Sequence, residues 1–180
     1  NPDSPRLGSL PNYARPVVGA VLRDLRELRQ AVSITGPRRV GKTTAVRQII
    51  SRLITDHSIP PGRIVYFSCD DPELFASPDL QKTLFDSLMA WLQRGPQPAY
   101  LFLDEIQRLP RWELFLKKYY DLDSPVRFVV TGSASSPIFR GSQESLLGRI
   151  KDRHLLPFSF REYCECKLAR SREFAGILAD

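Results

Sequence analysis

The segment Gly36–Thr43 constrains this chain more than any other part of its sequence. It reads Gly-Pro-Arg-Arg-Val-Gly-Lys-Thr, which matches the pattern of a phosphate-binding loop in full. Its glycines let the backbone turn tightly, so that successive N–H groups face one centre and can hold phosphate oxygens. The short apolar run Ala31–Thr35 precedes it, and a helical stripe at 46–53 follows it. A strand before and a helix after are the context that such a loop requires, and they disfavour a plain Gly-rich turn.

The residues of the loop are expected to contact a nucleotide, and two of them have specific roles. Lys42 is predicted to reach the β- and γ-phosphates of a nucleotide, and the Thr43 hydroxyl to ligate Mg²⁺. The other residues expected to contact nucleotide are Gly36, Pro37, Arg38, Arg39, Val40, Gly41 and Thr44. For the two arginines there are alternatives: they contact phosphate, point to solvent, or pair with acids such as Asp70 and Asp71.

The rest of the chain alternates between strand and helix patterns. Apolar runs predict strands at Ile64–Phe67, Tyr100–Leu103 and Val126–Val130, and a weaker one at His154–Leu156. The continuous apolar character of Ile64–Phe67 is typical of a strand that is buried on both faces. Helical spacing is found from Pro16, at 80–92, at 112–120, near 142–149 and from Phe160. Strands that alternate with helices at intervals of about 30 residues predict an α/β fold with a parallel sheet.

Two adjacent acids follow one of the buried strands. Asp104 and Glu105 come directly after Tyr100–Leu103, and ligands of open α/β sheets bind at the carboxyl ends of strands. Asp104 is therefore predicted to hold Mg²⁺, through water. An acid in the next position can orient and deprotonate an attacking water, so Glu105 favours hydrolysis of a nucleoside triphosphate over phosphoryl transfer. The alternative is that Glu105 is an exposed residue at a strand end.

Three further residues are candidates to sense or stabilise a γ-phosphate. Thr131 and Ser133 end the fourth strand, and one of these hydroxyls could position the water if that strand lies beside the strand of Asp104; Ser133 is slightly favoured. The alternative is a simple turn. Arg149 could act as an arginine finger, in its own chain or in a neighbour's, or be an ordinary surface residue.

The N-terminal part of the chain offers a candidate wall for the base. Tyr13, Arg15, Pro16 and Val17 are expected to line the adenine. Residues 1–12 are expected to form a flexible leader, since they contain three prolines and show little periodicity.

Charge and cysteine content indicate where in the cell the chain is expected and which classes of partner it could bind. The net charge is +6, and residues 1–60 hold ten basic and only four acidic residues. Such a basic excess suits either nucleotide phosphates or a nucleic acid. Three cysteines cannot form a secreted disulfide framework, no apolar run reaches the ~18 residues that span a bilayer, and no signal peptide is visible. A cytoplasmic location is expected, with no membrane partner.

Four sequence blocks together resemble a known family. The blocks are Ile34–Thr43, Leu103–Gln107, Val130–Ser133 and Pro157–Tyr163. In this order they resemble a group of bacterial and archaeal AAA+ P-loop ATPases, over roughly residues 13–166. The resemblance implies a three-layer AAA+ sandwich whose five-stranded parallel sheet has the order 5-1-4-3-2. It also implies ATP or ADP as the nucleotide, and Walker roles for Lys42, Thr43, Asp104 and Glu105.

Members of that group usually continue into a separate C-terminal domain. The resemblance therefore implies that residues 13–166 form the ATPase domain and that 167–180 begin a link to such a domain. That domain would be a partner of the ATPase domain and would respond to its nucleotide state.

The sequence leaves several functions open. The leading hypothesis is an Mg·ATP hydrolase, which could act as a homo-oligomer. The alternatives are a nucleotide-gated switch with little turnover and a DNA-associated motor. A P-loop kinase is disfavoured by Glu105 and by the lack of an acceptor-substrate motif.

Overall fold

A computed structural model describes residues 10–70, 78–95, 98–133 and 146–177 of the 180-residue chain. Its centre is a five-stranded sheet made of β1 (Ala31–Gly36), β2 (Ile64–Ser68), β3 (Ala99–Asp104), β4 (Val126–Ser133) and β5 (Ile150–His154). The strand order is β2-β3-β4-β1-β5, and every neighbouring pair is parallel. This order confirms the prediction, and β4 lies between β1 and β3.

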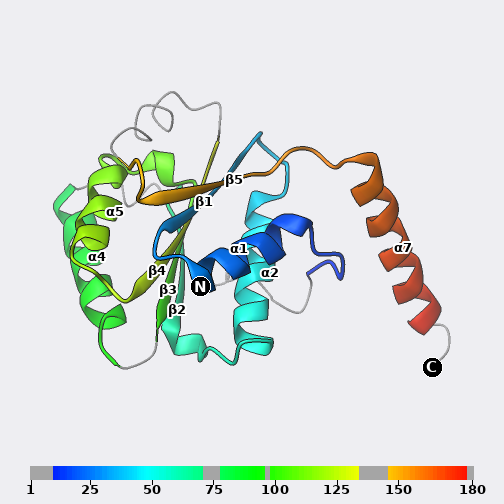
Figure 1. The fold of residues 1–180 in the computed structure, drawn as a ribbon, viewed down its shortest axis with the longest axis horizontal. Coiled ribbons are helices and arrows are strands. Elements are labelled where there is room, and N and C mark those ends of the chain that lie inside the picture. Colours follow the sequence, from blue (N-terminus) through cyan, green and yellow to red (C-terminus); the bar gives the residue numbers. More distant parts are fainter. Residues whose placement is uncertain (1–9, 71–77, 96–97, 134–145, 178–180) are drawn as a thin grey trace.

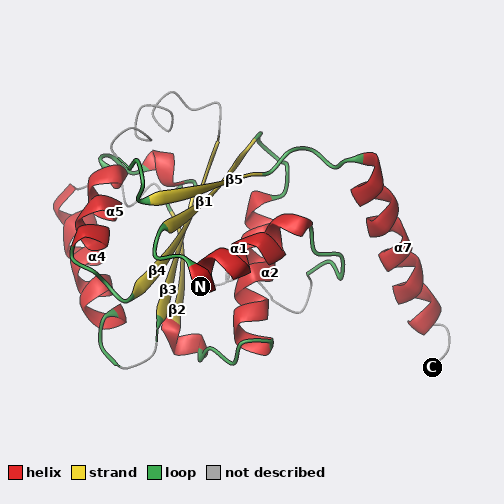
Figure 2. Ribbon diagram, viewed as in Figure 1, coloured by secondary structure: helices red, strands yellow, loops and turns green. Residues whose placement is uncertain are grey.

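Helices cover both faces of the sheet (Figures 1 and 2). One face carries α1 (Pro16–Glu27) and α2 (Lys42–Thr55), and the other carries α4 (Pro78–Leu92) and α5 (Trp112–Asp121). There are also two short 3₁₀ turns: η2 (Pro61–Arg63) directly precedes β2, and η3 (Ile106–Arg108) follows β3. The last helix, α7 (Phe160–Ile177), extends away from the sheet beyond α1 and α2.

The two helical layers bury two separate cores, because alternate residues of a strand point to opposite faces. On β3, Leu101 and Leu103 pack with α4 and α5, whereas Tyr100 and Phe102 pack with α1 and α2. All six residues of β1 and of β3 are buried. These central strands therefore have the apolar runs from which they were predicted.

The edge strands differ from the sequence prediction. β2 is only half-buried along most of its length, because it lies at the edge of the sheet and has a neighbour on one side only. β5 begins at Ile150 and ends at His154, whereas its predicted range was His154–Leu156. Its polar residues are stabilised by partners: Asp152 accepts a hydrogen bond from Ser33, and the Thr35 hydroxyl lies 2.8 Å from Nδ1 of His154.

The predicted helix near 142–149 falls partly outside the described residues, and residues 146–149 form turns. The predicted leader lies outside them up to residue 9. α7 continues without a break across residue 166.

Candidate functional site

The carboxyl ends of β1, β3 and β4 meet at one edge of the sheet. This edge brings together the loop that follows β1, the acids at the end of β3, and the hydroxyl residues at the end of β4. It is the position at which open α/β sheets bind ligands. The sequence pattern placed the loop and the acids at this edge, and the strand order implied by the family resemblance added the hydroxyl residues of β4.

The loop is shaped by two glycines. A Cβ atom on Gly36 would collide with the carbonyl oxygen of Leu155, because the chain after β5 passes directly over it. Gly41 has a φ of 98°, in the left-handed region, and α2 begins immediately after it. The N-terminus of α2 therefore points its free N–H groups into the curl of the loop, where they favour an anion.

Lys42 is buried inside this curl, with only 5% of its surface exposed. Its ammonium group donates to the carbonyl oxygens of Gly36 at 3.2 Å and Pro37 at 2.9 Å. A buried cation whose partners are backbone carbonyls is poorly neutralised, so the centre of the loop suits phosphate oxygens.

The loop arginines lie outside the curl. Pro37, Arg38 and Arg39 are exposed, and Asp70 pairs with Arg108 at 3.2 Å. The exposure of Arg38 and Arg39 agrees with the alternative in which they point to solvent, and Asp71 lies outside the described residues.

Asp104 accepts hydrogen bonds from three hydroxyl groups. Thr43 and Tyr66 both donate to its Oδ2 at 2.8 Å, and Thr131 donates to its Oδ1. The residue Asp104 is 4% exposed. Burial and the nearby Asp104 charge raise the pKa of Tyr66 above its usual value, so the phenol keeps the proton that it donates. A threonine hydroxyl beside a carboxylate is the oxygen donor set that Mg²⁺ prefers, and these residues fit that ion.

Glu105 is next to this cluster in an unusual backbone conformation. Its φ is 55°, in the left-handed region, and its N–H donates to the Thr131 hydroxyl at 3.0 Å. Its Oε2 accepts from the Gln107 amide at 2.5 Å. Thr131 thus joins the two acids, whereas Ser133 is buried beside Gly36, its register partner. Of the two predicted sensors, Thr131 is the one that contacts the acids.

Arg149 lies at the opposite edge of the sheet. Its carbonyl oxygen accepts from the N–H of Ala31, the first residue of β1, and the loop begins at the other end of that strand, about 16 Å away at ~3.3 Å per residue. Its guanidinium pairs with Asp121 at 2.9 Å. The prediction that Arg149 reaches a γ-phosphate in its own chain is therefore wrong. Action on a neighbouring chain stays a prediction.

A pocket of 390 Å³ opens beside the loop. Three segments line it: the residues before α1, the start of α2 with the end of the loop, and the start of α7. The lining includes Pro11, Tyr13, Arg15, Val40, Gly41, Thr44, Gln48, Phe158 and Tyr163. Tyr13 and Arg15 therefore line a pocket next to the loop, as expected of residues that would contact the adenine. Pro16 and Val17 do not line it, because α1 begins there and Val17 packs against the core.

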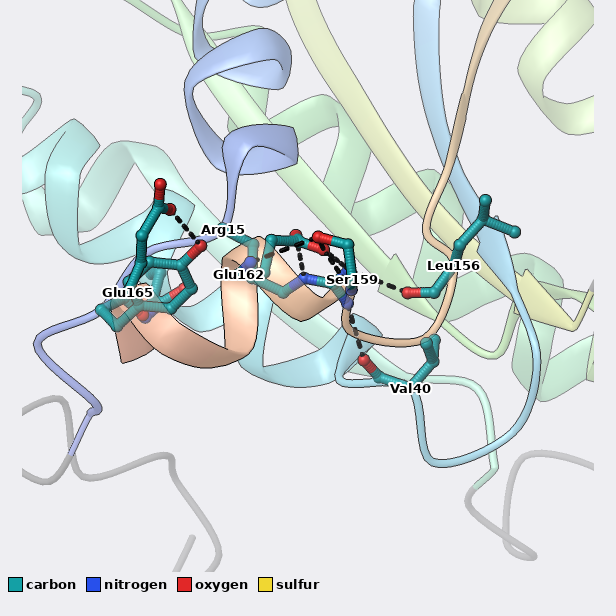
Figure 3. A network of polar contacts seen from close by, with 8 residues as sticks. Arg15, Val40, Leu156, Ser159, Glu162 and Glu165 are labelled. Carbon is teal, nitrogen blue, oxygen red and sulfur yellow. Dashed lines mark hydrogen bonds and ion pairs between the residues drawn. The ribbon is translucent and has the colours of Figure 1, made fainter. Parts of the chain in front are cut away.

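A polar network fastens α7 to this pocket (Figure 3). Arg15 donates to Glu162 at 2.9 and 3.1 Å, and to the carbonyl oxygens of Val40 and Leu156. Its guanidinium also lies 4.6 Å from the ring centre of Phe158. Glu162 closes a capping box with Ser159, accepting from the Ser159 N–H and donating its own N–H to the Ser159 hydroxyl. The block Pro157–Tyr163 thus begins α7 and joins it to the loop.

The network shifts two pKa values. The hydrogen bond from Arg15 lowers the pKa of Glu162 to about 2, against the opposing effect of burial, and the bonds from Ser159 add to the lowering. Burial, together with the hydrogen bond to Glu165, raises the pKa of Tyr13 to about 12. At neutral pH Glu162 is therefore an anion and Tyr13 is a neutral donor.

Sequence reasoning missed Tyr66 and the α7 side of the pocket. Tyr66 belongs to an apolar run and carries no local signal of its hydroxyl contact. Phe158 and Tyr163 lie in a block that carried the family resemblance, and this was a usable signal for a role at the site.

The fold and this loop define a P-loop nucleoside-triphosphate-binding domain. Residues 28–164 match the family model described as AAA domain. The chain therefore belongs to the AAA domain family of P-loop NTPases, as the resemblance implied.

Two relatives come from the archaeon Methanocaldococcus jannaschii. Uncharacterized protein MJ1637 is 33% identical over an alignment of 142 residues, and the match covers 75% of this chain and 28% of the relative. Uncharacterized protein MJ1544 is 30% identical over an alignment of 136 residues, and the match covers 74% of this chain and 28% of the relative. The chain thus spans little more than a quarter of the length of these relatives.

Solved structures share the fold at lower identity. The Saccharomyces cerevisiae Hsp104–ADP complex matches with a TM-score of 0.69 and 16% identity, over 91% of this chain and 25% of that one. Caenorhabditis elegans PCH-2 matches with a TM-score of 0.54 and 17% identity, over 79% of this chain and 42% of that one. None of the helices in the described part of the chain has the length and apolar character needed to span a membrane.

Proposed function

We propose that this chain binds Mg·ATP at the carboxyl edge of its sheet and hydrolyses it to ADP and phosphate. The observation that carries the proposal is that two features meet at the carboxyl ends of β1, β3 and β4. One is a buried lysine inside a loop at a helix N-terminus. The other is an aspartate held by the hydroxyl group that follows this lysine.

The roles follow from these contacts. Lys42 and the loop amides hold the β- and γ-phosphate oxygens, and Thr43 and Asp104 hold Mg²⁺, the aspartate through water. When bound, Mg²⁺ neutralises charge on the phosphate oxygens. Glu105 orients a water molecule toward the γ-phosphorus and accepts its proton, while Thr131 keeps the two acids in place. The water oxygen bonds to the γ-phosphorus as the bond from the γ-phosphorus to the bridging oxygen breaks, so that phosphate forms and ADP leaves.

The pocket beside the loop receives the adenine of ATP. Tyr13 and Phe158 line it with aromatic side chains, and Val40 and Thr44 connect the pocket to the loop. Because α7 supplies part of the wall, nucleotide occupancy and the position of α7 depend on each other. We infer that this dependence transmits the nucleotide state to whatever follows α7 in the full protein, such as a C-terminal domain.

A nucleotide switch with little turnover is a second candidate. The Gln107 amide donates to Oε2 of Glu105 and so fixes the orientation of the carboxylate. Turnover is slow if this orientation does not face the attacking water, and a partner or a neighbouring copy of the chain could release it.

A role as a DNA-associated motor has less support. In the basic segment 1–60, Arg15 and Arg29 pair with Glu162 and Asp123 from later in the chain, while Asp24 pairs with the later Arg153. Two basic residues of this segment therefore already have acidic partners within the chain.

Equilibrium binding of a fluorescent ATP analogue, with Mg²⁺ present, tests the proposal. The wild type should bind, and the Lys42→Ala variant should lose at least about tenfold in affinity, because phosphate would lose its buried cation. A charge-matched control is Lys151→Ala, on the exposed edge strand β5, which should bind as the wild type does. Unchanged affinity in Lys42→Ala would refute the assignment of the loop.

A further inference from the structure

Tyr66 places a hydroxyl group at the predicted magnesium carboxylate from outside the known motifs. It lies on edge strand β2, in register with Phe102 of β3. Its side chain packs partly against the core under α1 and α2, and its hydroxyl donates to Oδ2 of Asp104 at 2.8 Å. The same oxygen accepts from Thr43 at 2.8 Å.

We propose that Tyr66 is a positioning residue that orients Asp104 for magnesium. The inference rests on the proposed Mg·ATP site and concerns how tightly that site holds the ion. Neither the loop nor the acidic pair at the end of β3 includes this residue.

Counting acceptor positions shows what Tyr66 does to the carboxylate. An ionised carboxylate offers about four lone pairs for hydrogen bonds. Thr43 and Tyr66 use two on Oδ2, and Thr131 uses one on Oδ1. One position on Oδ1 is left for a water molecule of the metal shell.

The three hydroxyls also prevent the carboxylate from rotating. They come from three elements, α2, β2 and β4, so any rotation of Asp104 breaks at least one bond. Thr43 donates a hydrogen bond to Asp104, so the lone pairs of its oxygen stay available to the ion. Without the phenol, Oδ2 would keep only the Thr43 bond, and Asp104 could turn toward other donors.

The test is the Tyr66→Phe variant, which keeps the ring and removes only the hydroxyl. Tyr100→Phe is the matched control. Tyr100 lies on the adjacent strand, packs on the same face of the sheet, and is four residues from Asp104 at the other end of β3. Binding of a fluorescent, slowly hydrolysed ATP analogue is titrated with Mg²⁺ and repeated in EDTA, and the melting temperature of each variant is measured.

We expect Tyr66→Phe to need about ten times more Mg²⁺ for half-maximal binding, equivalent to about 1.4 kcal/mol. Its affinity in EDTA and its melting temperature should stay close to those of the wild type, and Tyr100→Phe should behave as the wild type throughout. An unchanged or lower Mg²⁺ requirement overturns the inference. So does an equal loss of affinity with Mg²⁺ and in EDTA, which would indicate a structural role. Failure of the wild type to bind nucleotide would instead refute the proposed function.

Discussion

The ion pair between Arg15 and Glu162 gives a quantitative prediction for the attachment of α7. Both side chains are largely buried, at 9% and 16% exposure, and the pKa of Glu162 falls from 4.5 to about 2. Replacing Glu162 with Gln removes the charge much as protonation does. At about 1.4 kcal/mol for each pKa unit, the charge of Glu162 stabilises the folded state by at most about 3 kcal/mol. Because Gln keeps part of the capping box, we expect a loss of about 2 kcal/mol.

Native-state hydrogen exchange measures this loss directly. Amides in the first turns of α7 report the free energy of its local detachment, which can lie below that of global unfolding. The matched control is Glu27→Gln, because the Arg26–Glu27 pair is more than half exposed on both sides. Such a pair contributes about 0.5 kcal/mol or less.

The pH dependence of this loss has a definite sign. The folded-state pKa of Glu162 lies below the unfolded value of 4.5, so the stabilisation is fully present above pH 4.5 and is lost as pH falls toward 2. Wild type and Glu162→Gln should therefore differ at pH 7 and converge near pH 2. A difference below about 0.5 kcal/mol at pH 7, or one that grows as pH falls, would refute the reasoning.

Further variants test the loop, the acidic pair and the far edge of the sheet. Gly36→Ala should lower the free energy of unfolding by at least about 2 kcal/mol in urea, since its Cβ would strike a backbone carbonyl. Gly19→Ala, in a helix with open space around it, should instead raise it by about 0.5–1 kcal/mol. Thr131→Val removes the hydroxyl that joins the two acids; it should lower kcat about tenfold or more and affect KM less, as steady-state kinetics would show. Arg149→Gln should leave nucleotide affinity unchanged at low chain concentration, and reduced affinity there would contradict its placement.

The parts of the site that sequence predicted are those with local causes. The loop was recognisable because Gly36 and Gly41 are needed for backbone reasons that neighbouring residues do not change. Asp104 was recognisable because β3 is buried along its whole length and therefore has an uninterrupted apolar run. The strand order followed only from the resemblance, and the structure confirms it.

The errors come from contacts between distant segments. β5 is a polar edge strand that depends on Ser33 and Thr35 of β1, so its own residues gave little signal. Arg149 was expected near the end of a helix at 142–149, but it directly precedes β5 and lies at the edge away from the loop. The Tyr66 contact depends on the register between β2 and β3, which a single sequence does not specify.

Phosphate release from Mg·ATP, measured for the wild type beside Glu105→Gln with nucleotide binding recorded for both, tests the central claim most directly. The account predicts that both proteins bind Mg·ATP with similar affinity, and that only the wild type releases phosphate. Equal rates of release in the two proteins would contradict the role of Glu105 as the base. Binding by both proteins with no release by the wild type would contradict hydrolysis by this chain and would favour the switch.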